Sequence, residues 1–100
     1  MAEIIWSDDA LVDLEKIYDF IARDSQLFAR HQVESIHNSV GRLLKFPKSG
    51  RHLPEFPELP HREIIIGSYR VIYRFDSDQN VVIIVSVVHV RRLLKKLFKE

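Results

Sequence analysis

The sequence of 100 residues contains no cysteine and has only three glycines and four prolines. Without cysteine, a disulfide scaffold, thiolate ligation of zinc or iron–sulfur clusters and a cysteine nucleophile are excluded. A reducing compartment fits this composition, and we expect a cytoplasmic protein. With 46% hydrophobic residues, the chain is long enough to bury a core of its own. We therefore expect a single domain over residues 1–100.

Long apolar runs are also missing. The longest, Val81 to Val85, continues only as Ser86-Val87-Val88, far below the ~20 residues that span a bilayer. The first residues are acidic where a signal peptide is basic, and no apolar stretch of signal-peptide character follows them. The sequence therefore predicts no membrane partner.

Nucleotide-binding and hydrolase motifs are absent as well. There is no Walker-type loop, no G-x-G-x-x-G, no H-E-x-x-H and no G-x-S-x-G. The five histidines do not fall at metal-ligand spacing. We expect no metal site and no small-molecule cofactor.

The formal net charge of +1 conceals an asymmetry along the chain. Residues 1–24 carry seven acidic and two basic side chains, whereas the last ten carry five basic and one acidic. This is not the uniformly basic balance of a protein that binds nucleic acid by counterion release. A local basic patch and an acidic partner both stay open.

The first half of the chain predicts a strand and two helices. Residues Glu3 to Trp6 form a short apolar strand, and Ser7 offers an N-cap for an amphipathic helix that runs to about Ala22. After a short break the helical period resumes and continues to about Phe46, where Pro47 follows. The short break predicts an antiparallel helical hairpin.

The second half predicts a loop and three strands. Residues 47–61 hold all four prolines and predict an ordered, irregular loop of the kind that is often functional. The strands at 62–66 and 69–75 flank Gly67-Ser68, which suits a type II′ turn. That turn pairs Ile66 with Tyr69, Ile64 with Val71 and Arg62 with Tyr73. Residues 81–90 are apolar on both faces and predict a central strand.

These elements define an α+β fold with the order β-α-α-β-β-β. The N-terminal helical hairpin packs on an antiparallel sheet, and the first strand adds to one edge. The basic stretch that starts at Arg91 can wind as a short C-terminal helix.

Polar residues gather around the loop and on one side of the predicted strand hairpin. They are Arg51, His52, Glu55, Arg62, Glu63, Arg70, Arg74 and His89. Phosphodiester cleavage by 2′-hydroxyl attack needs a base, an acid and cations on the developing charge, and arginine binds phosphate oxygens bidentately. Glu55, Glu63 or His89 can move protons. The alternative is a charge ladder of Arg70, Arg74 and Glu63 on a solvated sheet face, and spacing leaves both interpretations open.

Several short motifs follow one another along the chain. They are Trp6-Ser7, Pro47-Lys48-Ser49-Gly50-Arg51, Pro54-Glu55, Arg62-Glu63-Ile64, Tyr69-Arg70-Val71-Ile72-Tyr73-Arg74 and Val87-Val88-His89-Val90-Arg91. In this order and spacing the chain resembles the RelE/ParE toxin superfamily of bacterial type II toxin–antitoxin modules. The resemblance covers residues 4 to about 92.

That resemblance implies a toxin of a plasmid-stabilisation or addiction module, neutralised by a cognate antitoxin whose C-terminal segment wraps it. RelE-like members cut mRNA on the ribosome, whereas ParE-like members inhibit DNA gyrase. The chain looks closer to ParE, because its helical hairpin is long and no terminal tyrosine follows the His89-Val90-Arg91 pattern. We predict gyrase inhibition as the leading activity. A ribosome-dependent mRNA endoribonuclease and a non-toxic orphan interaction module are the alternatives.

The resemblance also suggests site residues. Arg70 and His89 occupy positions that are catalytic in some nuclease members, and Glu55 and Arg62 complete the catalytic set expected of a nuclease. The candidates for target or antitoxin binding are Arg51, Arg74, Arg91, Arg92, Leu94, Leu97 and Phe98. An edge of the sheet or an apolar groove beside the helical hairpin can accept an antitoxin segment, by strand addition or as a helix in a groove.

Overall fold

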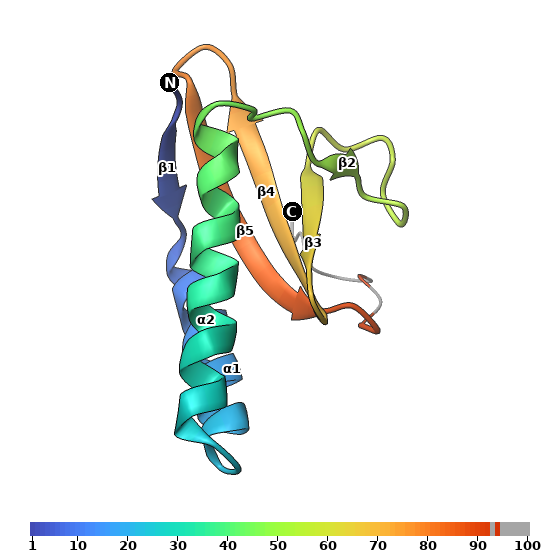
Figure 1. The fold of residues 1–100 in the computed structure, drawn as a ribbon. Coiled ribbons are helices and arrows are strands. Elements are labelled where there is room, and N and C mark those ends of the chain that lie inside the picture. The colour runs from blue at the N-terminus through green and yellow to red at the C-terminus, as the bar shows by residue number, and fades with distance from the viewer. Residues whose placement is uncertain (93, 95–100) are drawn as a thin grey trace.

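The computed structural model describes residues 1–92 and residue 94. A helical hairpin lies along one face of a five-stranded sheet (Figure 1), which confirms the expected α+β architecture. The elements in chain order are β1 (Glu3–Trp6), α1 (Asp8–Ala22), α2 (Gln26–Val40), a 3₁₀ helix (Gly41–Leu44), β2 (Arg51–His52), β3 (Arg62–Ile66), β4 (Tyr69–Asp76) and β5 (Val81–His89).

The sheet has the strand order β1-β5-β4-β3-β2. Strands β3, β4 and β5 form the expected antiparallel meander. The N-terminal strand lies at an edge, as predicted, but it runs parallel to β5, so the sheet is mixed. The two-residue strand β2 pairs with the start of β3 inside the proline-rich loop, where the sequence predicted only irregular structure.

The β3–β4 turn has the predicted register. Ile66 pairs with Tyr69 across Gly67-Ser68. Gly67 has a φ of 59°, and Asn80 is the one non-glycine residue with positive φ in the described part of the chain, so Ser68 keeps a negative φ. A positive φ at the first turn position alone is what a type II′ turn requires.

Helix α1 begins at the cap that the sequence predicts, and α2 begins at a serine cap that was not predicted. The side chain of Ser7 accepts a hydrogen bond from the backbone of Ala10, and Ser25 caps α2 in the same way. The second helix was expected to reach Phe46, but its α-helical part ends at Val40. Gly41 follows directly, and because glycine weakens an α-helix, the chain tightens into a 3₁₀ turn. Within the described residues no helix has both the length and the apolar character to cross a membrane.

The sheet carries a hydrophobic cluster on each face. The larger one lies under the helices and includes Ile36, Leu43, Ile64, Val71, Tyr73 and Ile84. The smaller one, on the face away from the helices, consists of Leu53, Ile72, Val88 and Leu94, with Phe56 and Val85 packed against it. The proline-rich loop and Leu94 therefore bury the middle of a sheet face for which the sequence left a solvated charge ladder open as one interpretation.

A β-bulge in β5 changes which side chains face the helices. The register between β4 and β5 shifts between Ile72 and Tyr73, and Val85 is left as an extra residue. Before the bulge Ile84 belongs to the cluster under the helices, and after it Val87 does. The residues of β5 that belong to the cluster under the helices are thus even-numbered before the bulge (Val82 and Ile84) and odd-numbered after it (Val87).

Helix α1 is bonded directly to this bulge. The carboxylate of Asp13 accepts hydrogen bonds from the hydroxyl of Ser86 at 2.8 Å and from the backbone N–H of Val87 at 2.9 Å. The hydroxyl of Ser7 donates to the carbonyl oxygen of Val85 at 3.0 Å. These bonds satisfy backbone groups that the irregular ladder leaves unpaired, and they fix α1 against β5.

We expect Gly50→Ala to lower the free energy of unfolding by about 1–3 kcal/mol. The backbone N–H of Gly50 donates to the Tyr73 hydroxyl at 2.9 Å. A Cβ there would lie 2.6 Å from both that hydroxyl and the carbonyl oxygen of Glu63. Gly41→Ala is the matched control, because a Cβ at Gly41 meets nothing within 4 Å and the helical position favours alanine. Urea unfolding of both variants checks this, and equal effects would contradict it.

Candidate functional site

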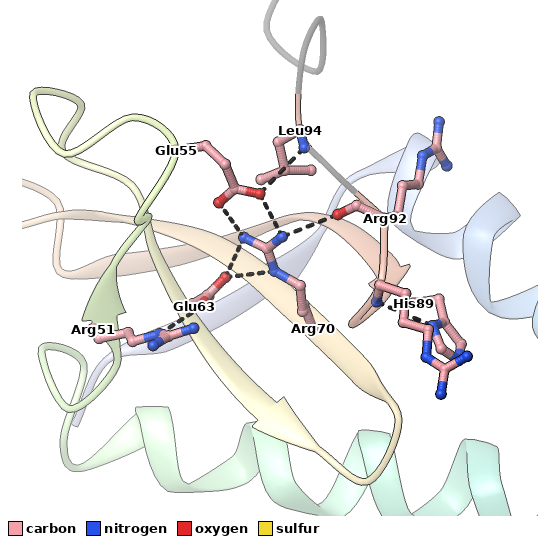
Figure 2. A network of polar contacts seen from close by, with 8 residues as sticks. Arg51, Glu55, Glu63, Arg70, His89, Arg92 and Leu94 are labelled. Atoms are coloured by element: carbon pink, nitrogen blue, oxygen red, sulfur yellow. Dashed lines mark hydrogen bonds and ion pairs between the residues drawn. The ribbon is translucent and has the colours of Figure 1, made fainter.

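Arg70 lies at the centre of a polar cluster on the sheet face away from the helices. Its Nε donates to Oε1 of Glu63 at 2.7 Å, and its two terminal nitrogens donate to the two carboxylate oxygens of Glu55 at 2.7 and 2.8 Å. Figure 2 shows the guanidinium between the two carboxylates. Arg70 is only 5% exposed and Glu63 only 1% exposed, so this is a buried ion-pair cluster.

Two further contacts complete the surroundings of the guanidinium. Nη1 also donates to the backbone carbonyl of Arg92 at 3.2 Å, and Nη2 makes an ion contact of 2.6 Å with Glu63. Four of these contacts are hydrogen bonds, and the fifth is an ion contact. Because a guanidinium carries five N–H bonds, Arg70 has little donor capacity left for a phosphate group.

The cluster balances its own charge and joins three segments of the chain. Glu63 also accepts from Nε of Arg51 at 2.6 Å, and Glu55 also accepts from the backbone N–H of Leu94 at 3.2 Å. We call Arg51, Glu55, Glu63 and Arg70 the Arg70 cluster. Two arginines and two glutamates make it neutral, and it ties the proline-rich loop and the segment after β5 to the β3–β4 hairpin.

The pKa values follow from these contacts. The hydrogen bond from Arg70 lowers the pKa of Glu55 to about 2, although burial of the carboxyl acts in the opposite direction. The hydrogen bond to Glu55 in turn raises the pKa of Arg70. Near neutral pH the Glu55 carboxyl is ionised and has no proton to donate.

The residues predicted for catalysis divide between the two faces of the sheet. Glu55 and Arg70 come together, as described. Successive residues of a strand point to opposite faces of the sheet, so Arg62 lies on the helix side while Glu63 lies on the other. There Nη1 of Arg62 donates to the carbonyl of Gly50 at 2.9 Å. His89 lies opposite Tyr69 on that same side, with the two ring centroids 5.7 Å apart. The structure thus brings together two of the four predicted catalytic residues.

The residues predicted for binding are scattered. Arg51 belongs to the Arg70 cluster and its side chain is 63% exposed. Arg91 and Arg92 are exposed after β5, whereas Leu94 is buried against the smaller hydrophobic cluster. Arg74 is partly exposed further along β4. Leu97, Phe98 and the expected C-terminal helix lie outside the described residues.

The interpretation of Arg70, Arg74 and Glu63 as a solvated charge ladder is wrong. Leu53 and Leu94 cover this part of the face, so Glu63 and Arg70 are buried. Glu63 was also missing from the predicted catalytic set, although it is a central member of the cluster. The signal was available in the predicted register, which places Glu63 diagonally across from Arg70.

A hollow of about 350 Å³ opens beside the cluster. It is lined by Arg51, Pro54, Glu55, Ile65, Arg70 and Val90. Ile65 and Val90 are exposed there, so much of its rim is apolar. Among the residues that the structure describes, no group of three or more histidine, cysteine or acidic side chains is arranged to hold a metal ion. The rim of the hollow is apolar, and the charges of the Arg70 cluster beneath it balance one another. Such a surface suits contact with a protein better than contact with a phosphate.

This fold is that of a toxin from type II toxin–antitoxin systems. The family model described as the ParE toxin of the type II toxin–antitoxin system, parDE, matches residues 4–94. The chain belongs to the ParE toxin family.

Individual relatives carry the names of both ParDE and RelE systems. Toxin RelE2 of Caulobacter vibrioides is 30% identical over 93 residues, which cover 93% of this chain and 100% of that protein. The chromosomal ParDE system of P. aeruginosa has a chain that matches with a TM-score of 0.74 at 22% identity, over 91% of this chain and 98% of that one. The E. coli RelBE toxin–antitoxin complex matches with a TM-score of 0.61 at 19% identity, over 92% and 100% of the two chains. These solved structures share the fold.

Proposed function

We propose that this toxin acts by binding a protein target, DNA gyrase, and not by cutting RNA. The observation that carries the proposal is the state of Arg70. A nuclease needs cations whose donors are free to meet the charge that develops on the phosphate. Arg70 already donates four hydrogen bonds to Glu55, Glu63 and the carbonyl of Arg92, and its Nη2 also contacts Glu63.

The other candidate catalytic residues support the same proposal. Glu55 is ionised near neutral pH because its pKa is lowered to about 2, so it cannot serve as a general acid. Arg62 and His89 lie across the sheet from the Arg70 cluster. A single phosphate cannot contact groups on both faces of a sheet at once.

The match to a ParE family model over residues 4–94 also supports gyrase as the target. One observation favours the alternative, a ribosome-dependent mRNA endoribonuclease: a relative with 30% identity is named toxin RelE2. The solved relatives from P. aeruginosa and E. coli belong to toxin–antitoxin systems. We propose a cognate antitoxin as the neutralising partner and the cytoplasm as the site of action.

Inducing the wild-type toxin in cells tests the activity. We expect chromosome breaks and, with purified proteins, inhibition of gyrase supercoiling, because a binding toxin needs only its target. The two readouts are DNA breaks and mRNA 5′ ends, followed in the same culture. Codon-periodic mRNA cleavage with intact chromosomes would establish the nuclease instead. Normal growth with neither signal would identify an orphan interaction module.

A further inference from the structure

The hollow beside the Arg70 cluster, which we call the Arg70 hollow, is built from three segments of the chain. Glu55 comes from the proline-rich loop, Ile65 from β3, and Val90 from the residues that follow β5. The Arg70 cluster ties these segments together, and the backbone N–H of Val90 also donates to the carbonyl oxygen of Ser68 at 2.8 Å. The hollow is therefore shaped before a partner arrives, which lowers the entropic cost of binding.

Two exposed aliphatic side chains form the apolar part of the rim. Ile65 is 47% exposed and Val90 is 38% exposed. Ile65 lies directly opposite Arg70 in the register of β3 and β4, so it borders the buried part of the cluster. Exposed aliphatic side chains beside a floor of balanced charge resemble the water-excluding centre of a protein interface.

The charge that this surface presents to solvent is positive. Arg51 donates its Nε to Glu63, yet its side chain is 63% exposed. Within residues 1–92 and 94 the terminal nitrogens of Arg51 form no hydrogen bond, whereas Glu63, the carboxylate that balances it, is buried. Arg91 is exposed directly after the rim and forms no ion pair in the same part of the chain. Cations therefore face outward, and the acidic side chains of the hollow are engaged by Arg70.

We propose that the Arg70 hollow receives an acidic, apolar loop of the target protein, an inference that rests on the proposed action on DNA gyrase. An apolar side chain of the loop packs between Ile65 and Val90, and a carboxylate beside it meets Arg51. Interface energy concentrates in a few such central contacts, while the surrounding surface excludes water. Opposite charges set the orientation of the loop and speed its association.

The charge of the surface argues against two other occupants. In a two-fold dimer the same surface of each copy meets itself, so a second toxin would bring Arg51 and Arg91 against cations of the same sign. The last six residues of this chain include three lysines and one glutamate, so their net charge also has the sign of the surface. An acidic partner from outside the chain fits the hollow better than either.

The first test compares variants at Ile65 in gyrase supercoiling with purified proteins. We expect Ile65→Asp to weaken inhibition about 100-fold, because it removes the apolar contact and sets a carboxylate against the acidic loop. Ile65→Lys removes the same contact but keeps the favourable sign of charge, so we expect a loss of only about 10-fold. The matched control is Ile5→Asp, because Ile5 is 46% exposed on β1 and two strands, β5 and β4, separate it from β3. It should stay within about 3-fold of wild type.

The second test isolates the cation. We expect Arg51→Gln to bind gyrase about 10-fold more weakly and with a smaller dependence on salt, because a charge at the rim of an interface acts mainly on association. Arg30→Gln, an exposed position on α2, should keep the wild-type affinity and salt dependence. Thermal unfolding of every variant verifies that it is folded. A change in salt dependence separates a charge contact from a mere loss of stability.

Binding to the protein encoded by the neighbouring reading frame, measured in the same variants, separates the outcomes. A folded Ile65→Asp toxin that binds this product but no longer inhibits gyrase supports the inference. Wild-type inhibition by Ile65→Asp overturns it and leaves the proposed function standing. Loss of binding to the neighbouring product with inhibition intact also overturns it, because the hollow then belongs to the antitoxin. If the wild-type toxin cleaves mRNA and leaves gyrase untouched, the proposed function fails and the inference fails with it.

Discussion

Replacing Arg70 by alanine is expected to lower the free energy of unfolding by about 3–5 kcal/mol, the usual cost of removing one partner from a buried ion pair. Glu63 is 1% exposed and would lose the cation that faces Oε1. Glu55 would lose both hydrogen bonds from the guanidinium. Urea unfolding at neutral pH measures the change.

Arg74→Ala is the matched control, because Arg74 follows on the same face of β4 but is partly exposed. We expect it to cost less than about 1 kcal/mol. The double variant Arg70→Ala with Glu63→Ala should recover part of the loss, because it also removes the buried carboxylate that would otherwise keep only Arg51 as a partner. A cost for Arg70→Ala as small as that for Arg74→Ala would contradict the buried cluster.

Acid is expected to weaken the fold through Glu55. In the folded protein its pKa is lowered from 4.5 to about 2. Folding therefore gains from the ionised carboxyl above about pH 4.5, and this gain disappears as the pH falls towards 2. A shift of this size corresponds to about 3 kcal/mol. Urea unfolding from pH 7 down to pH 2 measures it.

Glu55→Gln isolates this contribution from the other carboxyls. The variant should be less stable than wild type at pH 7, and the difference should shrink as the pH approaches 2. Glu58→Gln, an exposed position in the same loop, should keep the wild-type pH dependence. If Glu55→Gln and wild type lose stability in parallel, Glu55 does not bind Arg70 in its charged form.

The local parts of the fold could be predicted from the sequence. The Gly67-Ser68 turn set the β3–β4 register, and Ser7 marked the start of α1, because these signals act over a few residues. The parallel direction of β1 could not be predicted, since it depends on contact with a strand that begins at Val81. Helix α2 ends early because of Gly41. The prediction followed the apolar periodicity, which continues past this glycine to Phe46.

The candidate site was predicted only in part for a similar reason. Because side chains alternate along β3, Arg62 and Glu63 point to opposite faces of the sheet. This alone could have shown that Arg62 does not lie beside Arg70. Simple alternation from Ile84 places His89 on the face of Arg70, but the bulge at Val85 moves it to the helix side. The burial of Arg70 depends on Leu53 and Leu94, which are distant in sequence, so spacing within the strands could not reveal it.

The position of β1 in the sheet constrains how the toxin is made. Among the described residues β1 is the first strand to be synthesised, and β5, its neighbour in the sheet, is the last. Pairings between such distant segments form slowly, because a long loop must close first. Until Val81–His89 has been translated, β1 has no strand to pair with, and Ser7 and Asp13 lack the bulge that fixes α1. A growing chain therefore cannot complete the sheet or fix α1 against it until synthesis has passed β5.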